Sequence, residues 1–352
     1  MNYSLLEDIE ITSVSTAIPK GLEDAEFGKE GSANSNNEAY RSKKEQTASD
    51  LGFVAAEAAM AKFNISPDSI GVLLFVSTTP DYRSPATAFV LQKRLNIPAS
   101  CVAFDVNQGN TGFTQGLMMA SSMLLASNGT HGLLILGDTR SKQSLGKSNL
   151  MTGDSGGAVI IKQSKGAKPI HISMYTDSAN IKSAYIASGG FRTSIPKEHP
   201  SFLNEVASNM GSYSYDNEIF RRQAVSLFHD YFSHFSKKAG IREKEERYII
   251  LQTLDDEMKM SLLDGHSEIN KKNLLFLPER FGNSGSANPL VYLTENIKLF
   301  NPNKKSKFLC WTFGEGLTGA FISFEISSAA ILETIQTDSY YDDGHVSHNM
   351  DA

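Results

Sequence analysis

The chain has 352 residues, of which 40% are hydrophobic and 20% charged, and its formal net charge is −6. This acidic balance excludes the basic footprint of nucleic-acid-binding proteins, and no apolar run approaches the roughly 20 residues that span a membrane. The acidic N-terminus lacks the apolar stretch of a secretory signal, and the two cysteines, Cys101 and Cys310, lie in strand-like runs. We therefore expect a cytoplasmic protein with reduced thiols that contacts neither nucleic acid nor membrane.

The first half of the chain alternates strand-like and helix-like segments. Its strands are short, continuous apolar runs, and the segments between them carry apolar residues at helical spacing. This alternation is typical of a parallel-rich sheet that helices cover on both faces. The predicted strands are 9–14, 71–79, 101–106, 132–137 and 157–162, and the predicted helices are 49–63, 85–95 and 111–127.

The second half follows the same plan. One long helix is predicted over 215–240, where Phe220, Phe228 and Phe235 belong to an apolar stripe at helical spacing. Such a stripe indicates packing against a core. The predicted strands of this half are 168–176, 247–254, 273–278, 307–313 and 319–326.

Two local echoes indicate that the two halves are duplicates. NTGFTQGL (110–117) resembles NSGSANPL (283–290), and GDSGGAVII (153–161) resembles GEGLTGAFIS (314–323). A repeat of this length indicates duplicated domains, each with the order βαβαβαββ. Two such layers placed back to back would bury helices between their sheets. We therefore predict an N-terminal half over 1–165 and a C-terminal half over 166–326.

Three segments fit neither pattern. Residues 20–48 and 187–214 are rich in Gly, Ser, Asn and charged residues, and long irregular insertions of this kind often form functional rims. We expect ligand access and partner contacts there. The acidic, polar tail over 327–352 offers little to bury, so we predict that it is disordered.

Four collinear segments, 76–117, 153–161, 281–290 and 313–322, resemble ketoacyl-ACP synthase III enzymes, where ACP is acyl carrier protein. The resemblance implies the thiolase-like fold of condensing enzymes, a five-layered α-β-α-β-α sandwich. Enzymes of this family transfer an acyl group from coenzyme A to a cysteine and condense it with malonyl-ACP. Their Cys–His–Asn triad needs no cofactor and no metal. A cysteine at a helix N-terminus suits this chemistry because the helix dipole lowers the pKa of a thiol.

Laid onto this sequence, the triad reads Asn110, Gln252 and Asn283. Asn110 in NQGNTGF occupies the cysteine position, and Gln252 in LQTLD occupies the histidine position. An amide is not a nucleophile at neutral pH, and glutamine does not exchange protons as histidine does. The N–H groups of Gln252 and Asn283 remain as hydrogen-bond donors. We predict a pocket that binds acyl groups and does not condense them.

Other residues near these positions are candidates for the pocket or for an oxyanion hole. They are Thr111, Gly314, Glu315 and Gly316. Thr111 follows Asn110 and is expected to cap the helix, since hydroxyls often serve as N-caps. Glu315 replaces a glycine of the family's Gly-rich turn, and it either has a structural role or projects into the pocket. No metal-ligand spacing is present.

The resemblance leaves three interpretations of function open. The chain is a non-catalytic subunit that pairs with a Cys-bearing ketosynthase paralogue, as in polyketide, fatty-acid-type or alkylquinolone pathways. Alternatively, it is an acyltransferase, hydrolase or decarboxylase with altered, non-Cys chemistry on acyl-CoA or acyl-ACP. The third is a ligand-sensing homodimer. Because the third strand of the first half pairs across the dimer axis in this family, a homodimer or a heterodimer is expected.

Overall fold

The computed structural model describes residues 2–24, 38–143, 152–186, 213–242 and 245–342. Most of the predicted rims 20–48 and 187–214 lies outside these ranges. The described chain forms two main sheets, of six and five strands, and two small sheets of two strands each. Each small sheet pairs two three-residue strands in antiparallel fashion: β3 (Leu22–Asp24) with β4 (Glu38–Tyr40), and β10 (Ala184–Ile186) with β11 (Tyr213–Tyr215).

The six-stranded sheet has the order β15-β2-β8-β7-β5-β6. Its central strands are apolar and almost fully buried, as expected for a sheet covered on both faces. β5, β6 and β7 are parallel, whereas β8 runs antiparallel to both of its neighbours. The strands are β2 (Ile9–Pro19), β5 (Ile70–Val76), β6 (Val102–Val106), β7 (His131–Thr139), β8 (Asp154–Gln163) and β15 (Ile335–Thr337).

The five-stranded sheet has the order β1-β9-β14-β13-β12. β13 and β14 form a long antiparallel pair, and β12 adds to β13 in parallel. The strands are β1 (Asn2–Leu6), β9 (Ile170–Thr176), β12 (Tyr248–Leu251), β13 (Lys305–Gly314) and β14 (Thr318–Ser327). Because β12 and β13 are parallel, their C-terminal ends lie side by side, and these ends carry part of the site described below.

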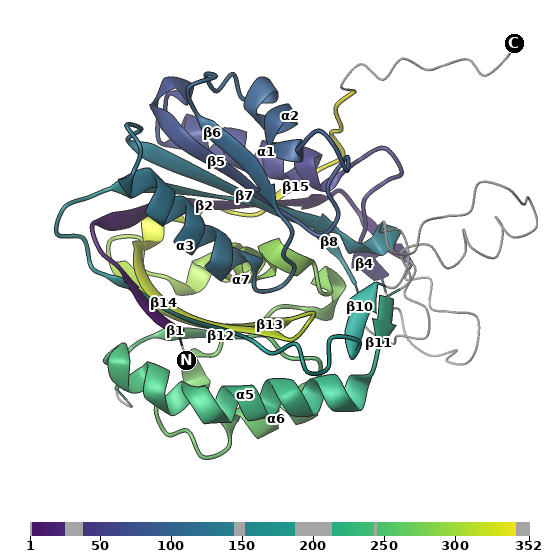
Figure 1. Cartoon of the computed structure of the whole chain (residues 1–352), viewed down its shortest axis with the longest axis vertical. Helices are drawn as coiled ribbons and strands as arrows, with labels where there is room; N and C mark the ends of the chain where they lie inside the picture. The colour runs from purple at the N-terminus through teal and green to yellow at the C-terminus, as the bar shows by residue number, and fades with distance from the viewer. Residues whose placement is uncertain (1, 25–37, 144–151, 187–212, 243–244, 343–352) are drawn as a thin grey trace, which may run out of the picture.

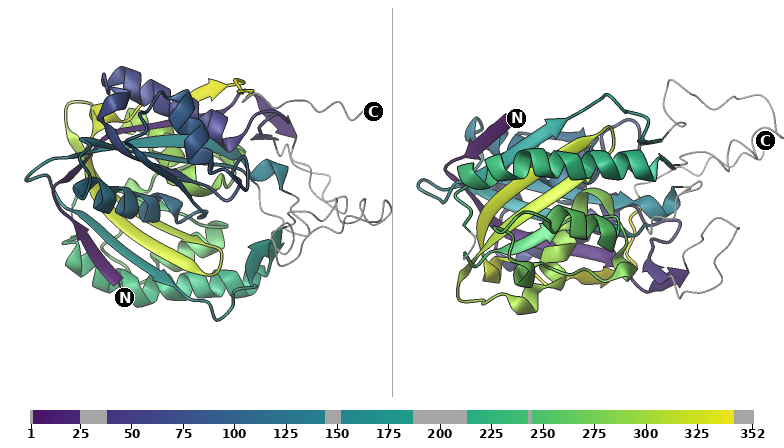
Figure 2. Two further views of the ribbon diagram at one scale, coloured as in Figure 1. Left: turned by 45° about the horizontal axis from the view of Figure 1, so that its top comes forward. Right: turned by 90° about the horizontal axis from the view of Figure 1, so that it is seen from below.

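Helices form three of the five layers (Figure 1). α1 (Ala48–Lys62) and α2 (Thr87–Arg94) cover the outer face of the six-stranded sheet. α5 (Asn217–Lys238) and α6 (Asp256–Leu263) cover the outer face of the five-stranded sheet. α3 (Gly112–Leu125) and α7 (Asn288–Glu295) lie between the two sheets, as the turned views in Figure 2 also show. The predicted α-β-α-β-α sandwich is confirmed.

Short 3-10 helices connect these elements. Within the described residues they are Pro67–Ser69, Arg140–Lys142, Lys271–Asn273, Glu279–Phe281, Gly285–Ala287, Ile297–Leu299 and Ser328–Ala330. Two of them, at Arg140 and at Gly285, border the site. No helix in the described ranges is long and apolar enough to cross a membrane.

The inner layer is packed tightly enough to require small residues on α3. A Cβ atom added at Gly116 would lie 2.7 Å from Leu134 Cδ1, and one added at Gly112 would lie 2.7 Å from Val76 Cγ1. α3 therefore lies directly on β5 and β7. This contact places the N-terminal end of α3 where β5 and β6 end.

The predicted strand 273–278 is wrong. Asn273 ends a 3-10 helix, Leu274 makes a single isolated bridge with Ile249, and residues 275–278 have no regular secondary structure. Its apolar letters suggest a buried strand, yet Phe276 is 67% exposed. The carbonyl oxygen of Phe276 accepts a hydrogen bond from the side chain of Asn296 instead of from a neighbouring strand.

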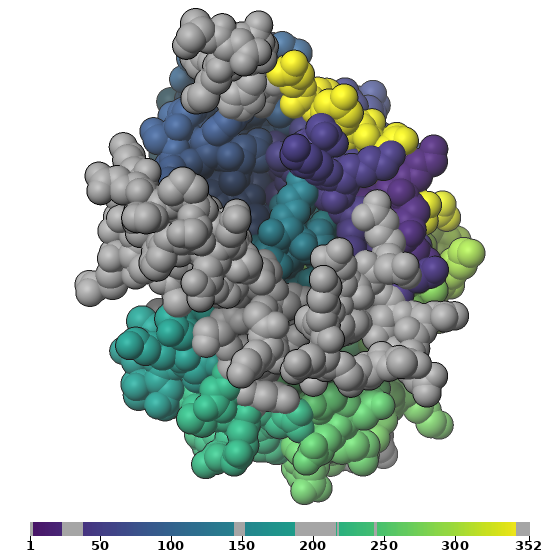
Figure 3. All heavy atoms as spheres, turned by 90° about the vertical axis from the view of Figure 1, so that its right-hand side faces the viewer, coloured from purple at the N-terminus to yellow at the C-terminus, as the bar shows by residue number. Residues whose placement is uncertain are grey.

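The prediction that the tail is disordered from residue 327 is also wrong as far as residue 342. β15 pairs in parallel with β2, and the Tyr341 ring packs edge-on against Phe53 at 4.7 Å. Gln46 donates hydrogen bonds to the carbonyl oxygens of Thr337 and Ser339. In Figure 3 the yellow C-terminal segment lies against the purple and blue N-terminal half. Residues 343–352 lie outside the described ranges.

The two predicted halves exchange strands. β1, from the start of the chain, pairs with β9 in the five-stranded sheet. β15, from beyond residue 326, joins the six-stranded sheet. The chain otherwise passes from one sheet to the other between β8 and β9, around residues 165 and 166. Each sheet is thus completed by a strand from the other end of the chain.

Candidate functional site

Asn110 is buried at the start of α3, with only 4% of its surface exposed. Its side-chain oxygen has no hydrogen-bond partner among the described residues. Thr111 is the N-cap residue of α3, but its side chain makes no capping hydrogen bond, so the predicted cap is wrong. The Thr111 hydroxyl instead lies 3.1 Å from Thr318 Oγ1 and 3.4 Å from Gln108 Oε1. The start of α3 is therefore tied to β14 across the inner layer.

Gln252 directly follows β12 and is also buried. Its side-chain oxygen accepts a hydrogen bond of 3.1 Å from the backbone N–H of Phe313, at the end of β13. The next residue, Gly314, is adjacent to Asn110, because a Cβ atom added at Gly314 would lie 3.7 Å from Asn110 Cβ. β13 thus connects Gln252 to the start of α3.

Asn283 lies in the turn before the 3-10 helix Gly285–Ala287. Its side-chain oxygen accepts a hydrogen bond of 3.0 Å from Gly285 N–H, and its carbonyl oxygen accepts one from Gly153. Ser286, within that 3-10 helix, approaches α3 closely, since a Cβ atom added at Gly112 would lie 3.0 Å from Ser286 Cβ. Asn283 therefore hydrogen-bonds Gly285, and the next residue, Ser286, packs against the start of α3.

Asp138, which sequence reasoning missed, joins the segments around this site. It is fully buried at the end of β7. One carboxylate oxygen accepts hydrogen bonds of 2.7 Å from both the backbone N–H and the hydroxyl of Thr78. The other accepts a hydrogen bond of 2.8 Å from Ser286 N–H. A single carboxylate therefore connects the end of β5 to the turn that carries Asn283.

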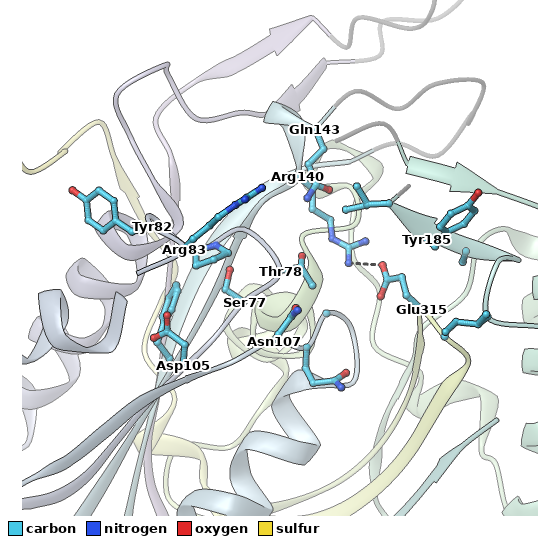
Figure 4. A pocket seen from close by; sticks show the side chains of 18 residues that line it. Ser77, Thr78, Tyr82, Arg83, Asp105, Asn107, Arg140, Gln143, Tyr185 and Glu315 are labelled. Carbon is cyan, nitrogen blue, oxygen red and sulfur yellow. Dashed lines mark hydrogen bonds and ion pairs between the residues drawn. The ribbon is translucent and has the colours of Figure 1, made fainter. Parts of the chain in front are cut away.

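A cavity of about 900 Å³ opens beside the start of α3 (Figure 4). Gln108 and Gly109, the two residues that precede Asn110, contribute to its wall. Its most buried charged group is Arg140, whose guanidinium pairs with Glu315 at 2.8 Å. The wall also includes Ser77, Thr78, Asn107, Tyr82, Arg83, Asp105, Gln143, Ile181, Tyr185, Ile186 and Gly316.

Of the predicted pocket candidates, Glu315 and Gly316 line this cavity. Thr111 and Gly314 instead lie beside Asn110 through the contacts given above. Arg140 was not predicted, because the partner of a single arginine after a strand depends on which loop folds against it. The signal that the sequence offered was the acid at position 315 in a glycine-rich turn, since a partly buried acid needs a cationic or hydrogen-bonding partner.

Neither cysteine provides a thiolate for this site. Burial raises the pKa of Cys101, at the start of β6, to about 11. Complete burial also raises the pKa of Cys310, within β13. Both groups therefore stay protonated at neutral pH, and a protonated thiol is a weak nucleophile.

Histidines in the described part of the chain form side-chain hydrogen bonds with residues other than Asn110. The pairs are His171 with Tyr3, His131 with Thr130, and His229 with His266. No group of three or more His, Cys, Asp or Glu residues is arranged for a metal ion in the described part of the chain.

Comparison with known proteins shows which proteins this chain resembles. The family model for 3-oxoacyl-[acyl-carrier-protein (ACP)] synthase III matches residues 104–178, which include Asn110 and α3. A beta-ketoacyl-[acyl-carrier-protein] synthase III 2 from Vibrio vulnificus is 27% identical over 276 residues, which cover 77% of this chain and 73% of that protein. The chain is ketoacyl-ACP synthase III-like. A synthase III from Rhizorhabdus wittichii is 36% identical over a shorter stretch of 124 residues, 34% of this chain and 39% of that protein.

The fold of this synthase III-like chain is the thiolase-like fold of solved relatives. A 3-oxoacyl-(acyl-carrier protein) synthase from Burkholderia xenovorans superimposes with a TM-score of 0.84 at 24% identity. The superposition covers 96% of this chain and 99% of that one. The predicted fold class is therefore confirmed. The roles predicted for Asn110, Gln252 and Asn283 stay predictions.

Proposed function

We propose that this synthase III-like chain is a non-catalytic, acyl-binding subunit that pairs with a Cys-bearing ketosynthase paralogue. The observation that carries the proposal is Asn110, a buried amide at the start of α3 where the related enzymes are expected to hold their cysteine. An amide forms no acyl thioester, so the first half of the condensing reaction has no nucleophile.

The neighbours of Asn110 do not replace the missing chemistry. The Thr111 hydroxyl needs a base to act as a nucleophile, and its hydrogen-bonding neighbours are Gln108, Thr318 and Gln115, none of which is a base. The Gln252 side-chain oxygen is already engaged by the backbone of Phe313. Binding does not depend on a nucleophile, and the cavity beside Gln108 and Gly109 offers a volume in the usual range of small-ligand sites.

β6 supports the pairing part of the proposal. It is an edge strand, because it pairs only with β5 among the described strands. An edge strand presents unpaired backbone groups that another chain can bond. Val102 on β6 is 48% exposed and Phe89 on the adjacent α2 is 50% exposed, so apolar surface lies beside this edge. The location we propose is the cytoplasm, which suits two unpaired thiols.

Incubation of the purified, partner-free chain with acyl and malonyl thioesters tests the catalytic part. We expect neither a covalent acyl adduct by intact-mass measurement nor a condensation product. The matched variant is Asn110→Cys with Gln252→His, which restores a thiol and a base at the two family positions. We expect this variant to gain an acyl adduct. Carbon–carbon bond formation by the unmodified chain would overturn the proposal.

One observation favours a second candidate function, decarboxylation of a malonyl thioester. The side-chain oxygens of Gln252 and Asn283 both accept backbone hydrogen bonds, so their amide N–H groups are the parts left to bind a ligand oxygen. Donors that stabilise an enolate oxygen can promote loss of CO₂ without a nucleophile. Release of CO₂ from malonyl thioester in the same incubation, reduced by Gln252→Leu, would establish this function instead.

A further inference from the structure

The cavity contains a buried ion pair that an acyl ligand would have to contact. Arg140 is only 5% exposed, and its guanidinium lies 2.8 Å from a Glu315 carboxylate oxygen. The Glu315 side chain keeps 24% of its surface exposed, so one side of the pair remains open to the cavity. Figure 4 shows the pair opposite Thr78 and Asn107.

The absence of a side chain at Gly109 lets the Arg140–Glu315 pair lie close to the start of α3. A Cβ atom added at Gly109 would lie 2.7 Å from an Arg140 guanidinium nitrogen and 2.8 Å from a Glu315 carboxylate oxygen. The pair therefore packs against the main chain of the residue that precedes Asn110. A thioester held beside Asn110 with its acyl group in the cavity would place the first carbons of that group against the pair.

The chemistry of the wall selects among acyl groups. Its charged residues are Arg83, Arg140, Asp105 and Glu315, so their formal charges cancel. A saturated alkyl group would cover the Arg140–Glu315 pair without replacing the hydrogen bonds that water makes to it, which is costly. A ligand carboxylate would meet an Arg140 charge that Glu315 already neutralises, and it would be repelled by the Glu315 carboxylate. A neutral acyl group with a hydroxyl or carbonyl oxygen avoids both costs.

We propose that this cavity takes neutral acyl groups that carry a hydroxyl or carbonyl oxygen, such as 3-hydroxyacyl groups, in preference to alkyl or carboxylated ones. This inference rests on the proposed acyl-binding function. Arg140 and Glu315 are its specificity-determining residues: the guanidinium donates to the ligand oxygen, and the carboxylate accepts from a ligand hydroxyl.

Calorimetric titration of the full chain tests the preference directly. The probes are stable amide analogues of pantetheine that carry butyryl, 3-hydroxybutyryl or succinyl groups, since pantetheine is common to coenzyme A and to acyl carrier protein. We expect 3-hydroxybutyryl to bind about tenfold more tightly than either of the others, the effect of one good hydrogen bond to a charged group. This comparison needs no variant.

A charge variant then assigns the preference to the ion pair. Glu315→Gln removes the repulsion and leaves the Arg140 charge in the cavity, so succinyl binding should rise about tenfold. Asp256→Asn, an acid-to-amide change at a side chain that is 99% exposed on α6, should leave the order of the three ligands unchanged. Circular dichroism and thermal melting confirm that both variants are folded.

Each outcome decides between the two proposals. Equal binding of butyryl and 3-hydroxybutyryl analogues, or tighter binding of butyryl, overturns the inference and leaves the acyl-binding function standing. Unchanged succinyl binding in a folded Glu315→Gln variant also removes the assigned role of the pair. If none of the three analogues binds, the proposed acyl-binding function itself is wrong.

Discussion

The residue whose removal should cost the most stability near the site is Asp138. Its carboxylate accepts hydrogen bonds from Thr78, which follows β5, and from Ser286, in a 3-10 helix of the other half of the chain. Asp138→Ala would leave the buried N–H of Ser286 and the partly buried N–H of Thr78 without this acceptor, and an unsatisfied buried group costs about 1–3 kcal/mol. We expect the free energy of unfolding to fall by about 3 kcal/mol or more, measured by urea denaturation.

Asp256→Ala is the matched control for this substitution. The Asp256 side chain is 99% exposed, and surface substitutions usually change stability by less than about 0.5 kcal/mol. Equal denaturation midpoints for the two alanine variants would show that the Asp138 bonds contribute little. A urea midpoint for Asp138→Ala equal to that of the unmodified chain would also show that these bonds contribute little.

The sequence identified candidate site residues more readily than it identified the side chains and backbone groups that those residues contact. Asn110, Gln252 and Asn283 were selected from short motifs, and the roles assigned to them stay predictions. Asp138 and Arg140 were not located, because their roles depend on loops that are distant in sequence. A buried carboxylate or guanidinium acquires its function from the groups that fold against it, and no local pattern encodes those groups.

The segment that follows α6 packs against α5 through a pair of histidines whose protonation affects stability. His229 Nδ1 lies 2.9 Å from His266 Nε2, and the two rings stack. Burial, and then the positive charge of His229, lowers the pKa of His266, while Asp264 and Glu268 act in the opposite direction. The unfolded chain therefore binds this proton more readily, since an unperturbed histidine has a pKa of about 6.5. The stability contributed by neutral His266 is lost as the pH falls below about 6.5.

His266→Phe should weaken this pH dependence. Phenylalanine keeps an aromatic ring against Phe228 and Phe232 but takes up no proton. We expect the decline in the free energy of unfolding between about pH 7.5 and pH 5 to become shallower, with part of the slope kept because burial also lowers the pKa of His131 and His171. His234→Gln, at an exposed position of α5, is the control. A steeper or unchanged slope in His266→Phe contradicts the assignment.

The C-terminal segment shows how side-chain bonds can order a polar sequence. Composition predicted disorder because residues 335–342 contain little apolar surface. Their order comes from other sources: three residues of β15 pair with β2, Lys20 N–H bonds the Thr337 carbonyl at 2.9 Å, and the Arg94 guanidinium lies 4.8 Å from the centre of the Tyr341 ring. Pattern reasoning detects apolar periodicity, so a segment held mainly by hydrogen bonds to distant residues escapes it.

Truncation separates this ordered part from the residues that follow it. A chain that ends at Thr334 lacks β15 and the bonds from Gln46 to Thr337 and Ser339. We expect it to be less stable by about 3 kcal/mol, since each lost hydrogen bond contributes about 1 kcal/mol. It should also aggregate more, because part of the β2 edge becomes unpaired. A chain that ends at Asp342 keeps all these contacts, and its urea midpoint should match that of the full chain. Equal midpoints for the two truncations would contradict this role.

For the whole molecule, the layered architecture was predictable because both sheets are built from continuous apolar runs. Those runs predicted both central sheets, and the echoes between the halves predicted their back-to-back packing. The strand exchange was not predictable, since β1 and β15 are short strands that each join the sheet of the opposite half. The apolar run 273–278 was wrongly predicted as a strand for a related reason. Its exposure depends on the segments that pack around it and not on its composition, and Phe276 is exposed.

The same architecture leaves β6 as an open edge, and pairing through it is the last testable consequence. Val102→Lys places a charge on the exposed side of that edge, where a second chain would have to bury it at considerable cost. We expect the variant to lose co-purification with a co-expressed Cys-bearing ketosynthase paralogue and to elute as a monomer in size-exclusion chromatography with light scattering.

Met260→Lys is the matched control, because Met260 is 61% exposed on α6, in the layer farthest from β6 (Figure 1). It introduces the same charge on an exposed apolar residue and should leave pairing unchanged. Should Val102→Lys pair as well as Met260→Lys, the contact between subunits does not use β6. Should the unmodified chain associate only with itself while the paralogue is present, it is a homodimer and the pairing proposal is wrong.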